Sequence, residues 1–284
     1  MSDFCVVIPA KNEGSIIAKV VADVIVLPNC KEVIVVDDGS DDNTAIAAGK
    51  AGARVISHPY SKGNGAAIKT GARAAQESLV VFMDGDGQHR AVDIPRLLDR
   101  LSEGFDLVVG ARIKGCQASF GRKVANRLYN CLASFMTGNR IEDLTSGFRA
   151  VKREKFLEFI NLLPNGFSYP TTSTMAFFRT GYSVDYVWVT ADSRQGKSHI
   201  KPIQDGIRFM LIIFKIGTLY SPLKLFVPIS LILFFIGSAY YGFTFFTMGR
   251  FTNMSALMFT TSLVVFLVGL VSEQITALMY SKSG

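Results

Sequence analysis

The sequence predicts an α/β domain with a mostly parallel sheet, followed by two membrane-spanning helices. Strand-like and helix-like patterns alternate through the first two thirds of the 284 residues, as in sheets that carry helices on both faces. The last part instead contains two runs without charged residues, 225–246 and 251–272. Each run has about the 20 residues needed to cross a hydrocarbon core, so the two runs predict a transmembrane hairpin.

Five strands are predicted from short runs of β-branched and aromatic residues, which are FCVVIP, EVIVVDD, ARVIS, LVVFMD and DLVVGA in chain order. Helical periodicity fills the intervals between them, over 14–26, 42–51, 65–77 and 93–101. In open sheets of this kind, ligands bind beyond the carboxyl ends of the strands. The residues that follow each predicted strand are therefore candidates for a functional site.

The orientation of the hairpin is predicted from its flanking charges. Lys224 precedes the first apolar run, Lys282 follows the second, and the turn between them contains only Arg250. Because cytoplasmic segments carry an excess of Lys and Arg, both termini and the N-terminal domain are expected in the cytoplasm. The alternative is a buried hairpin in a soluble core, which is disfavoured because such cores seldom lack charge for so long.

The net charge of the chain indicates which classes of partner it binds. It has 30 Lys and Arg residues against 23 Asp and Glu residues, a net charge of +7. Of the charged residues, only three follow Lys224, namely Arg250, Glu273 and Lys282. The excess of positive charge therefore belongs to the N-terminal domain. A basic domain suits anionic lipid surfaces and phosphorylated substrates. No nucleic-acid-binding motif accompanies the charge, so no nucleic-acid partner is predicted.

Two amphipathic helices are expected near the hairpin, at about 119–137 and 201–221. In the first, one face collects Phe120, Val124, Leu128, Leu132 and Phe135, while Arg122, Lys123 and Arg127 lie elsewhere. Ordinary domain helices packed on a core are the alternative. Basic polar faces beside a transmembrane hairpin favour helices that lie in the membrane interface.

Two carboxylates follow the fourth predicted strand, in the segment LVVFMDGDGQH. Asp84 and Asp86 lie one residue apart, and Gly85 and Gly87 allow a sharp turn or the close approach of a ligand. Two acidic groups held close together repel each other unless a positive charge lies between them. The segment therefore predicts a site for a divalent cation with oxygen ligands.

Polar groups also follow the first two strands. The first ends in Pro9-Ala-Lys-Asn-Glu13, and the second ends in Asp37 and Asp38. The two aspartates would accept hydrogen bonds from a base or ribose, or would only form a turn into the next helix. In the segment Lys62-Gly-Asn-Gly-Ala-Ala67, the lysine and the backbone amides before a helix are suited to a diphosphate.

Taken in order, the motifs VVIPAKNEG, VVDDGSDDNT, KGNGAA, DGDGQH and DLTSGFRA resemble those of family 2 glycosyltransferases with the GT-A fold. The similarity is greatest to the branch that contains dolichyl-phosphate mannose synthase and the bacterial polyprenyl-phosphate glycosyltransferases. It covers roughly residues 3–200, and the hairpin agrees with the membrane-anchored members. It implies a GT-A catalytic domain over 1–200, a juxtamembrane helix over 201–221 and a hairpin over 222–280 with spans at about 225–246 and 254–278.

The resemblance implies a nucleotide-sugar donor site. Its residues come from the strand ends and the glycine-rich segments, namely Pro9, Ala10, Lys11, Glu13, Asp37, Asp38, Lys62, Gly63, Gly65 and Gly85. Arg194, Lys197 and Ser198 match a loop that closes over the donor diphosphate. Two positions depart from the family pattern: Lys11 replaces a common aromatic residue, and His199 replaces a common lysine.

The same resemblance implies the catalytic and acceptor groups. Asp84, Asp86 and Gln88 would hold Mg²⁺ or Mn²⁺ at the diphosphate, and Arg112 and Arg194 would act with the acidic pair in catalysis. Phosphate contacts on the acceptor side are implied for Arg122, Ser146 and Arg149. Asp143 would align the acceptor or accept a proton, or would only hold Arg149 in place, and the sequence leaves these alternatives open.

The function implied is an inverting, metal-dependent transfer of a sugar to the phosphate of a polyprenyl phosphate, either undecaprenyl or dolichyl phosphate, at the cytoplasmic face of the membrane. A UDP-sugar is the favoured donor, with GDP-mannose as the alternative, and a homo-oligomer is compatible with this class. Because the second ionisation of a phosphate monoester lies near about pH 6, such an acceptor is largely dianionic at neutral pH and needs little help from a base.

Three other functions are alternatives to this one. A transferase that extends a sugar chain is the main alternative, but processive members carry a Gln-x-x-Arg-Trp motif, whereas the sole tryptophan here, Trp188, lies in YVWV. A sugar-nucleotide pyrophosphorylase is disfavoured by the hairpin and the SGFR motif. A catalytically silent membrane scaffold that binds nucleotide is disfavoured by the intact acidic pair.

Overall fold

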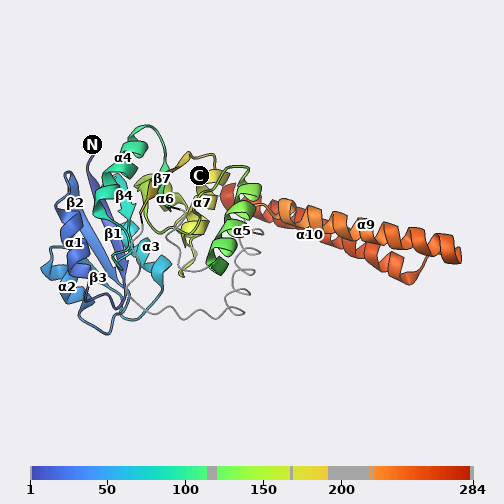
Figure 1. Cartoon of the computed structure of the whole chain (residues 1–284), viewed down its shortest axis with the longest axis horizontal. Helices are drawn as coiled ribbons and strands as arrows, with labels where there is room; N and C mark the ends of the chain where they lie inside the picture. The colour runs from blue at the N-terminus through green and yellow to red at the C-terminus, as the bar shows by residue number, and fades with distance from the viewer. Residues whose placement is uncertain (1, 114–119, 167–168, 191–217, 219, 282–284) are drawn as a thin grey trace. The chain divides into compact units, whose positions relative to one another are not determined.

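The computed structural model describes residues 2–113, 120–166, 169–190, 218 and 220–281. The chain divides into two compact units, Met1–Ile200 and Lys201–Gly284. The first is an α/β unit, and the second contains two long helices (Figure 1). Most of the amphipathic helix expected at 201–221 lies outside the described residues.

A seven-stranded sheet forms the centre of the first unit, in the order β3-β2-β1-β4-β6-β5-β7. Its strands are β1 (Phe4–Ala10), β2 (Cys30–Asp37), β3 (Arg54–Ser57), β4 (Leu79–Phe82), β5 (Leu107–Arg112), β6 (Arg149–Lys152) and β7 (Val184–Val189). Every neighbouring pair is parallel except the two pairs that involve β6. The prediction of a mostly parallel α/β sheet is therefore confirmed.

Strands β6 and β7 are additional to the five predicted strands. β6 is only four residues long and has a basic residue at each end, so it lacks the apolar run that indicates a strand. β7 has the sequence VDYVWV, whose β-branched and aromatic residues could have indicated it. Because β6 is antiparallel to β4, the segment that precedes it lies next to the carboxyl end of β4.

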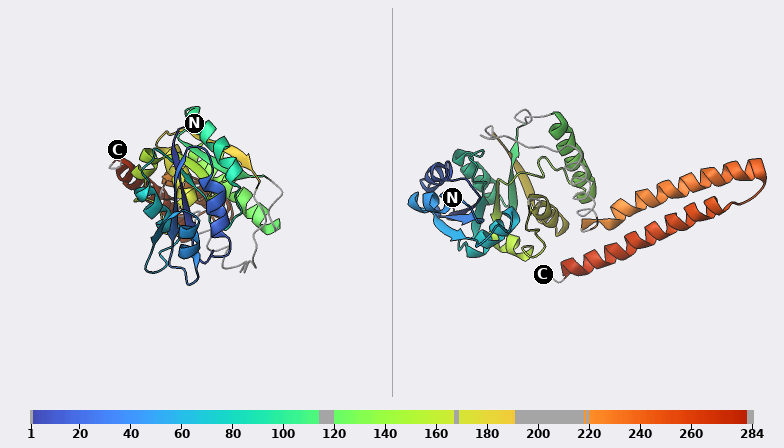
Figure 2. Two further views of the ribbon diagram at one scale, coloured as in Figure 1. Left: turned by 90° about the vertical axis from the view of Figure 1, so that its left-hand side faces the viewer. Right: turned by 90° about the horizontal axis from the view of Figure 1, so that it is seen from below.

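Helices cover both faces of the sheet (Figure 2). They are α1 (Ile17–Ile25), α2 (Thr44–Lys50), α3 (Asn64–Ala74), the 3₁₀ turn η1 (Ala91–Asp93), α4 (Ile94–Ser102), α5 (Phe120–Thr137), α6 (Arg153–Glu158) and α7 (Tyr169–Arg179). The apolar faces of α1 and α4 pack on the valines of one sheet face. On the other face α3 lies so close that a Cβ atom on Gly71 would overlap Val7. The buried helix α7 carries polar side chains into this unit.

The second unit is an antiparallel hairpin of α9 (Pro222–Met248) and α10 (Asn253–Ser281), which run side by side (Figure 2). Both helices are long and apolar enough to cross a membrane. At a rise of about 1.5 Å per residue each is roughly 40 Å long, which exceeds a hydrocarbon core of about 30 Å. The predicted hairpin of apolar helices is thus confirmed, with helices that extend a few residues beyond the predicted spans.

Small residues line the contact between α9 and α10. They recur at intervals of seven and are buried, with Ser230, Gly237 and Thr244 on α9 and Ser255, Ser262 and Gly269 on α10. Ser230 Oγ donates to the carbonyl oxygen of Ser262 (2.9 Å), and Ser262 Oγ donates to that of Ser230 (2.8 Å). Small residues let two helices approach closely, and hydroxyls paired across the contact hold them together.

Glu273 stabilises one end of the same hairpin. Its Oε2 accepts a hydrogen bond from the backbone N–H of Leu223 (3.3 Å), which lies in the first turn of α9. The first backbone N–H groups of a helix have no partner within the helix, and a carboxylate is well suited to them. The carboxylate that follows the second apolar run therefore has a structural role at a helix start.

Candidate active site

A cavity of about 550 Å³ lies at the carboxyl ends of β1, β2 and β4. Its walls come from the strand ends, the start of α3 and the segments before β6 and in α7, and comprise Pro9, Ala10, Lys11, Glu13, Asp38, Ser61, Gly63, Asn64, Ala67, Asp84, Gly85, Asp86, Thr145, Gly147, Tyr169 and Pro170. The cavity thus brings together most of the predicted donor residues and both predicted metal-binding aspartates. Segments more than a hundred residues apart in sequence share it.

Asp84 and Asp86 follow β4 as expected, and both line the cavity. Gly85 passes close to β1, since a Cβ atom on it would lie 3.2 Å from the carbonyl oxygen of Pro9. Gly87 has a positive φ of 71°, a conformation that glycine adopts at little cost. Both glycines therefore allow the chain to turn tightly at the acidic pair, as the sequence predicts.

The two residues after this turn do not enter the cavity. The backbone N–H of Gln88 donates to Asp86 Oδ1 (3.1 Å), and its role as a metal ligand stays a prediction. His89 is buried, with its ring stacked on Phe148 at a centroid distance of 4.9 Å and its Nε2 atom 4.0 Å from Asp84 Oδ2. Burial lowers the pKa of His89 to about 4, despite the opposing charge of Asp86. The imidazole is therefore neutral at neutral pH.

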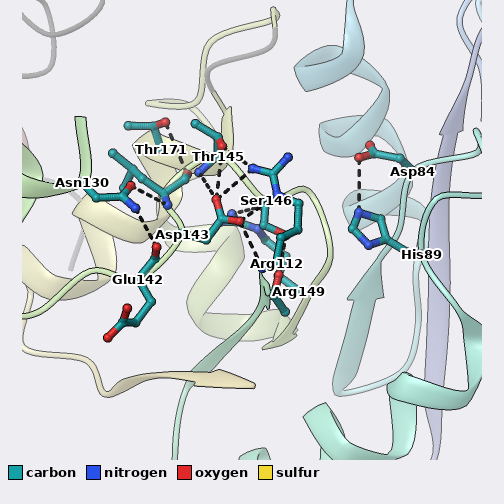
Figure 3. Close-up of polar contacts among 12 residues, drawn as sticks. Asp84, His89, Arg112, Asn130, Glu142, Asp143, Thr145, Ser146, Arg149 and Thr171 are labelled. Carbon is teal, nitrogen blue, oxygen red and sulfur yellow. Dashed lines mark hydrogen bonds and ion pairs between the residues drawn. The ribbon is translucent and has the colours of Figure 1, made fainter. Parts of the chain in front are cut away.

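Arg112 and Asp143 form a bidentate ion pair next to the cavity (Figure 3). Arg112 Nε donates to Asp143 Oδ2 (2.8 Å), and Nη2 donates to Oδ1 (3.0 Å) and to Thr145 Oγ1 (2.6 Å). Burial alone would raise the pKa of Asp143, but the hydrogen bonds and charge of Arg112 outweigh it and lower the pKa. The hydrogen bonds of Asp143 thus go to Arg112 and Thr145, and its role in aligning the acceptor, accepting a proton or holding Arg149 stays a prediction.

Arg149 lies inside the unit and not on the cavity wall. Its guanidinium donates to oxygen atoms of Ser146, Pro170, Ser173 and Thr174. Ser146 is also buried, and its hydroxyl donates to the carbonyl oxygen of Gly110 (2.7 Å). Contrary to expectation, neither side chain faces the cavity to meet an acceptor phosphate. The reason is that α7 and β5 offer both groups oxygen acceptors inside the unit.

Asp38 organises the loop that precedes α3. Its Oδ1 atom accepts from His58 Nδ1 (2.7 Å) and the Lys62 N–H (2.8 Å), and its Oδ2 atom accepts from the Ser61 hydroxyl (2.7 Å) and the Gly63 N–H (2.8 Å). Burial would raise the pKa of Asp38, but these hydrogen bonds lower it to about 2. The carboxylate therefore fixes the two loop residues, Ser61 and Gly63, that line the cavity.

Close packing explains the glycines of the KGNG segment. A Cβ atom on Gly63 would overlap the carbonyl oxygen of Asn165, and one on Gly65 would overlap that of Pro164. The Ala66 N–H, at the start of α3, donates to the Asn165 carbonyl (3.0 Å). Gly63 lines the cavity, whereas Gly65 does not. Contact of this segment with a diphosphate stays a prediction, because the packing alone requires the glycines.

Asp37 and Lys62 do not line the cavity. Asp37 is buried, and its Oδ1 atom accepts hydrogen bonds from the backbone N–H (3.1 Å) and the hydroxyl of Ser40. The ammonium of Lys62 lies 5.6 Å from the ring centroid of Tyr60. Asp37 thus shapes the turn after β2, and the donor-binding roles of Asp37 and Lys62 stay predictions.

Four predicted site residues cannot be placed against the cavity. Arg194, Lys197 and Ser198 lie outside the described residues, so the loop over the diphosphate stays a prediction. Arg122 belongs to α5, in the part of that helix whose side chains are likewise not described. The helix itself is present where the amphipathic pattern predicts one.

Two residues that shape the site are not indicated by any sequence pattern. Asn130 on α5 donates to the carbonyl oxygen of Glu142 (2.6 Å) and accepts from the Leu144 N–H (3.2 Å), so it clamps the segment that carries Asp143. Its partners lie more than ten residues away in an irregular segment, which no periodicity reveals. Tyr169 lines the cavity from α7, but a single tyrosine in YPTTST is indistinguishable by pattern from a core residue.

Comparison with known families agrees with this geometry. Residues 5–159 match the family described as Glycosyl transferase family 2, and residues 221–278 match the GtrB C-terminal hairpin. The first match covers more than half of the chain and contains the strand ends that build the cavity. The chain belongs to glycosyltransferase family 2.

Several curated relatives are similar over two thirds or more of the chain. Glycosyltransferase AglJ of Haloferax volcanii is 33% identical over 226 residues, which are 77% of this chain and 73% of that protein. The Dolichyl-phosphate hexose transferase of the same organism is 31% identical over 206 residues, or 72% and 89% of the two chains. Polyprenol monophosphomannose synthase of Mycolicibacterium smegmatis is 33% identical over 206 residues, or 67% and 77%.

Solved structures share the fold. Glucosyl-3-phosphoglycerate synthase from Mycobacterium tuberculosis, in complex with Mn²⁺, UDP-glucose and phosphoglyceric acid, is similar with a TM-score of 0.60 and 26% identity over 74% of this chain and 79% of that one. A complex of the same enzyme with Mg²⁺ and UDP has a TM-score of 0.59 and 25% identity, again over 74% and 79%. The α/β unit therefore has a GT-A-like fold.

Proposed function

We propose that this glycosyltransferase transfers a sugar, with inversion, from a nucleotide sugar to the phosphate of a polyprenyl phosphate at the cytoplasmic membrane face. A UDP-sugar is the favoured donor and GDP-mannose the alternative, and undecaprenyl or dolichyl phosphate serves as acceptor. Relatives named for dolichyl phosphate and for polyprenol support the acceptor class. The hairpin of long apolar helices supports a substrate that resides in a membrane.

The bidentate ion pair between Arg112 and Asp143 is the main structural support for this proposal. Both oxygens of the carboxylate accept hydrogen bonds from the guanidinium, and the pKa of Asp143 is lowered as a result. A carboxylate held in this way is a poor proton acceptor, because general bases work best with a pKa near the operating pH. The site therefore suits an acceptor that arrives already ionised, and a phosphate monoester is largely dianionic at neutral pH.

The proposed reaction needs no proton transfer. An oxygen of the acceptor phosphate forms a bond to the anomeric carbon while the bond between that carbon and the donor diphosphate breaks. The electron pair of the broken bond leaves with the nucleoside diphosphate. The loop fixed by Asp38 and the charge of Lys11 on the cavity wall are suited to hold the donor while this happens.

The cavity fits a Mg²⁺ or Mn²⁺ ion at Asp84 and Asp86. Both carboxylates line it and offer the hard oxygen ligands that these ions prefer. A bound cation would supply the charge that stabilises the departing diphosphate. The two carboxylates would hold it, together with oxygens of the donor.

A screen for product identifies the donor and the acceptor together. The full chain in detergent or lipid is incubated with Mn²⁺ or Mg²⁺, a short polyprenyl phosphate and each of a panel of UDP- and GDP-sugars, and the lipid product is weighed by mass spectrometry. We expect one nucleotide sugar to add a single hexose-class residue to the lipid phosphate. The matching polyprenol without phosphate is the control and should be inert. Equal transfer to a neutral sugar chain would contradict the proposal and favour chain extension.

The membrane topology is proposed from the same hairpin. The α/β unit and Gly284 are assigned to the cytoplasm, and the turn before α10 to the opposite side. On the outer side of α5, the exposed Arg127 and Phe135 suit a helix at a membrane surface. In a chain whose four cysteines are replaced, Asn253→Cys should react with an impermeant thiol reagent only from outside. Labelling from the cytoplasmic side alone would overturn this topology.

A further inference from the structure

Gly147 lies next to the Asp84 carboxylate, just beyond the paired ends of β4 and β6. β4 and β6 are antiparallel, and Phe82 pairs with Arg149 at the end of the ladder. Continued by two residues, this register places Gly147 opposite Asp84. Directly opposed residues point their side chains to the same face, with Cβ atoms about 4.5–5.5 Å apart. A side chain at position 147 would therefore compete with the Asp84 carboxylate for space.

There is little space between Gly147 and the Asp84 carboxylate. A Cβ atom on Gly147 would lie 2.6 Å from Asp84 Oδ2 and 3.0 Å from Oδ1, closer than real Cβ contacts. The φ angle of Gly147 is not in the left-handed region, so backbone conformation does not require a glycine there. The atoms that such a Cβ would meet belong to the Asp84 side chain, so a side chain at position 147 would displace the carboxylate.

Buried groups hold Gly147 in this place. The Tyr169 hydroxyl donates to the Gly147 carbonyl oxygen (3.2 Å). Arg149 donates to the carbonyl oxygen of the preceding Ser146 and, through Nη1, to that of Pro170 (2.9 Å) (Figure 3). Since Arg149 and Tyr169 are fully buried, moving the segment would break hydrogen bonds that water cannot replace. The segment is therefore a fixed support and not a loose loop.

We propose that Gly147, held by Tyr169 and Arg149, is a positioning residue that sets the place of the Asp84 carboxylate for a divalent cation. Arg149 then serves the metal site through the backbone and not by touching the acceptor phosphate. The proposal rests on the proposed function only in taking Asp84 as a metal ligand. The SGFR motif, whose residues the family resemblance links to the acceptor, thereby has a role in binding the metal.

The test measures metal binding directly. Mn²⁺ affinity of the full chain is determined from the electron paramagnetic resonance signal of free Mn²⁺, with UDP present and, separately, with GDP. We expect Gly147→Ala to weaken Mn²⁺ binding by about tenfold or more, because an overpacked neighbour forces the carboxylate off its position. The KM for a polyprenyl phosphate at saturating Mn²⁺ should change by less than about twofold, since the acceptor contacts are untouched. Mn²⁺ binding equal to that of the unmodified chain would overturn the proposal.

Two glycine variants are matched controls. A Cβ atom on Gly166 meets nothing within 4 Å, so Gly166→Ala should leave Mn²⁺ affinity unchanged. A Cβ atom on Gly71 overlaps Val7 in the core, away from the cavity, so Gly71→Ala should lower thermal stability without weakening Mn²⁺ binding. If Gly71→Ala weakens binding as much as Gly147→Ala does, general destabilisation explains the effect and the positioning role is overturned.

A double-mutant cycle separates positioning from the metal assignment. Tyr169→Phe removes the hydroxyl that holds Gly147 and provides a milder variant if Gly147→Ala does not fold. Either change should weaken Mn²⁺ binding alone but add little in an Asp84→Asn background, because residues that act through one another are not additive. Full additivity would overturn the positioning role. If Asp84→Asn alone leaves Mn²⁺ binding unchanged, the metal assignment of the proposed function fails as well.

Discussion

The two units of the chain bury polar side chains of different kinds. In the α/β unit the buried groups include charged side chains such as Asp38, Asp143 and Arg149, each held by several partners. In the described part of the hairpin the buried polar side chains are all serine or threonine, of which Ser230 and Ser262 pair across the two helices. Burying a charge costs far more than burying a hydroxyl. The α/β unit thus holds these buried charges with several partners each, whereas the buried polar groups of the described hairpin are hydroxyls, which cost less to bury.

The largest effect is expected at the acidic pair itself. Asp86→Asn should fold normally but lower sugar transfer by about 10³-fold, because a bound metal contributes several kcal/mol to stabilising the departing charge. Transfer rate as a function of Mn²⁺ concentration and thermal stability in detergent are measured together. Asp93→Asn, which changes an acid paired with Arg96 away from the cavity, is the control and should keep its activity. Unchanged turnover of Asp86→Asn with metal still required would remove Asp86 from the metal site.

The next effect concerns the buried ion pair. Arg112→Met should cost about 3 kcal/mol of unfolding free energy, since it leaves the Asp143 carboxylate buried without its partner. Adding Asp143→Leu should restore part of this loss, because replacing both members by apolar groups removes the unpaired charge. Thermal unfolding of both variants in detergent decides the matter. If the double variant is less stable than Arg112→Met alone, then Asp143 stabilises the unit through contacts other than its ion pair with Arg112.

A smaller effect, with a defined pH dependence, is expected at Asp38. Its pKa of about 2 lies below the unfolded value of about 3.9, so it contributes about 2 kcal/mol of stability above pH 4. This contribution is lost as the pH falls through the pKa of the folded state. Asp38→Asn should be less stable by about this amount at pH 7 and should lose stability less steeply between about pH 4 and pH 2. Asp41→Asn, at an exposed position of the same turn, is the control.

The smallest effect is expected in the hairpin. Ser230→Ala removes a hydroxyl that bonds across α9 and α10, and such pairs contribute about 0.6 kcal/mol on average in membranes. Thermal unfolding in detergent should shift slightly, and the Mn²⁺ dependence of transfer should not change. Ser238→Ala, whose hydroxyl donates only within its own helix to the Phe234 carbonyl, is the matched control. An activity loss as large as that of Asp86→Asn would contradict the division of roles between the two units.

The parts of the site that the sequence predicted are those encoded locally. The apolar run ending at Phe82 indicates a strand, and the acidic pair follows it within a few residues, so the strand and the carboxylates could be placed from one short stretch. The hairpin was predictable for the same reason, because uninterrupted apolar runs have few alternative structures. The structure confirms both.

The roles of Arg149 and Asp38 could not be predicted, because their partners are distant in sequence. Whether the Arg149 guanidinium turns towards a substrate or into the unit depends on Ser173 and Thr174, which are 24 and 25 residues away on α7. The carboxylate of Asp38 likewise accepts hydrogen bonds from a loop that follows β3. A motif identifies which residues are present, but the fold determines which of them line the cavity.

In the proposed reaction the acceptor enters already ionised, and Asp143 is not its base. The most direct test is the pH dependence of kcat/KM for a polyprenyl phosphate and for the corresponding phosphonate, whose second ionisation lies at a higher pH. Activity should rise with an apparent pKa near about 6 for the phosphate, and this rise should move to higher pH with the phosphonate. Asp143→Asn should leave the position of the rise unchanged. A rise that stays fixed when the acceptor changes and disappears in Asp143→Asn would show that an enzyme carboxylate accepts a proton, and would overturn the proposed reaction.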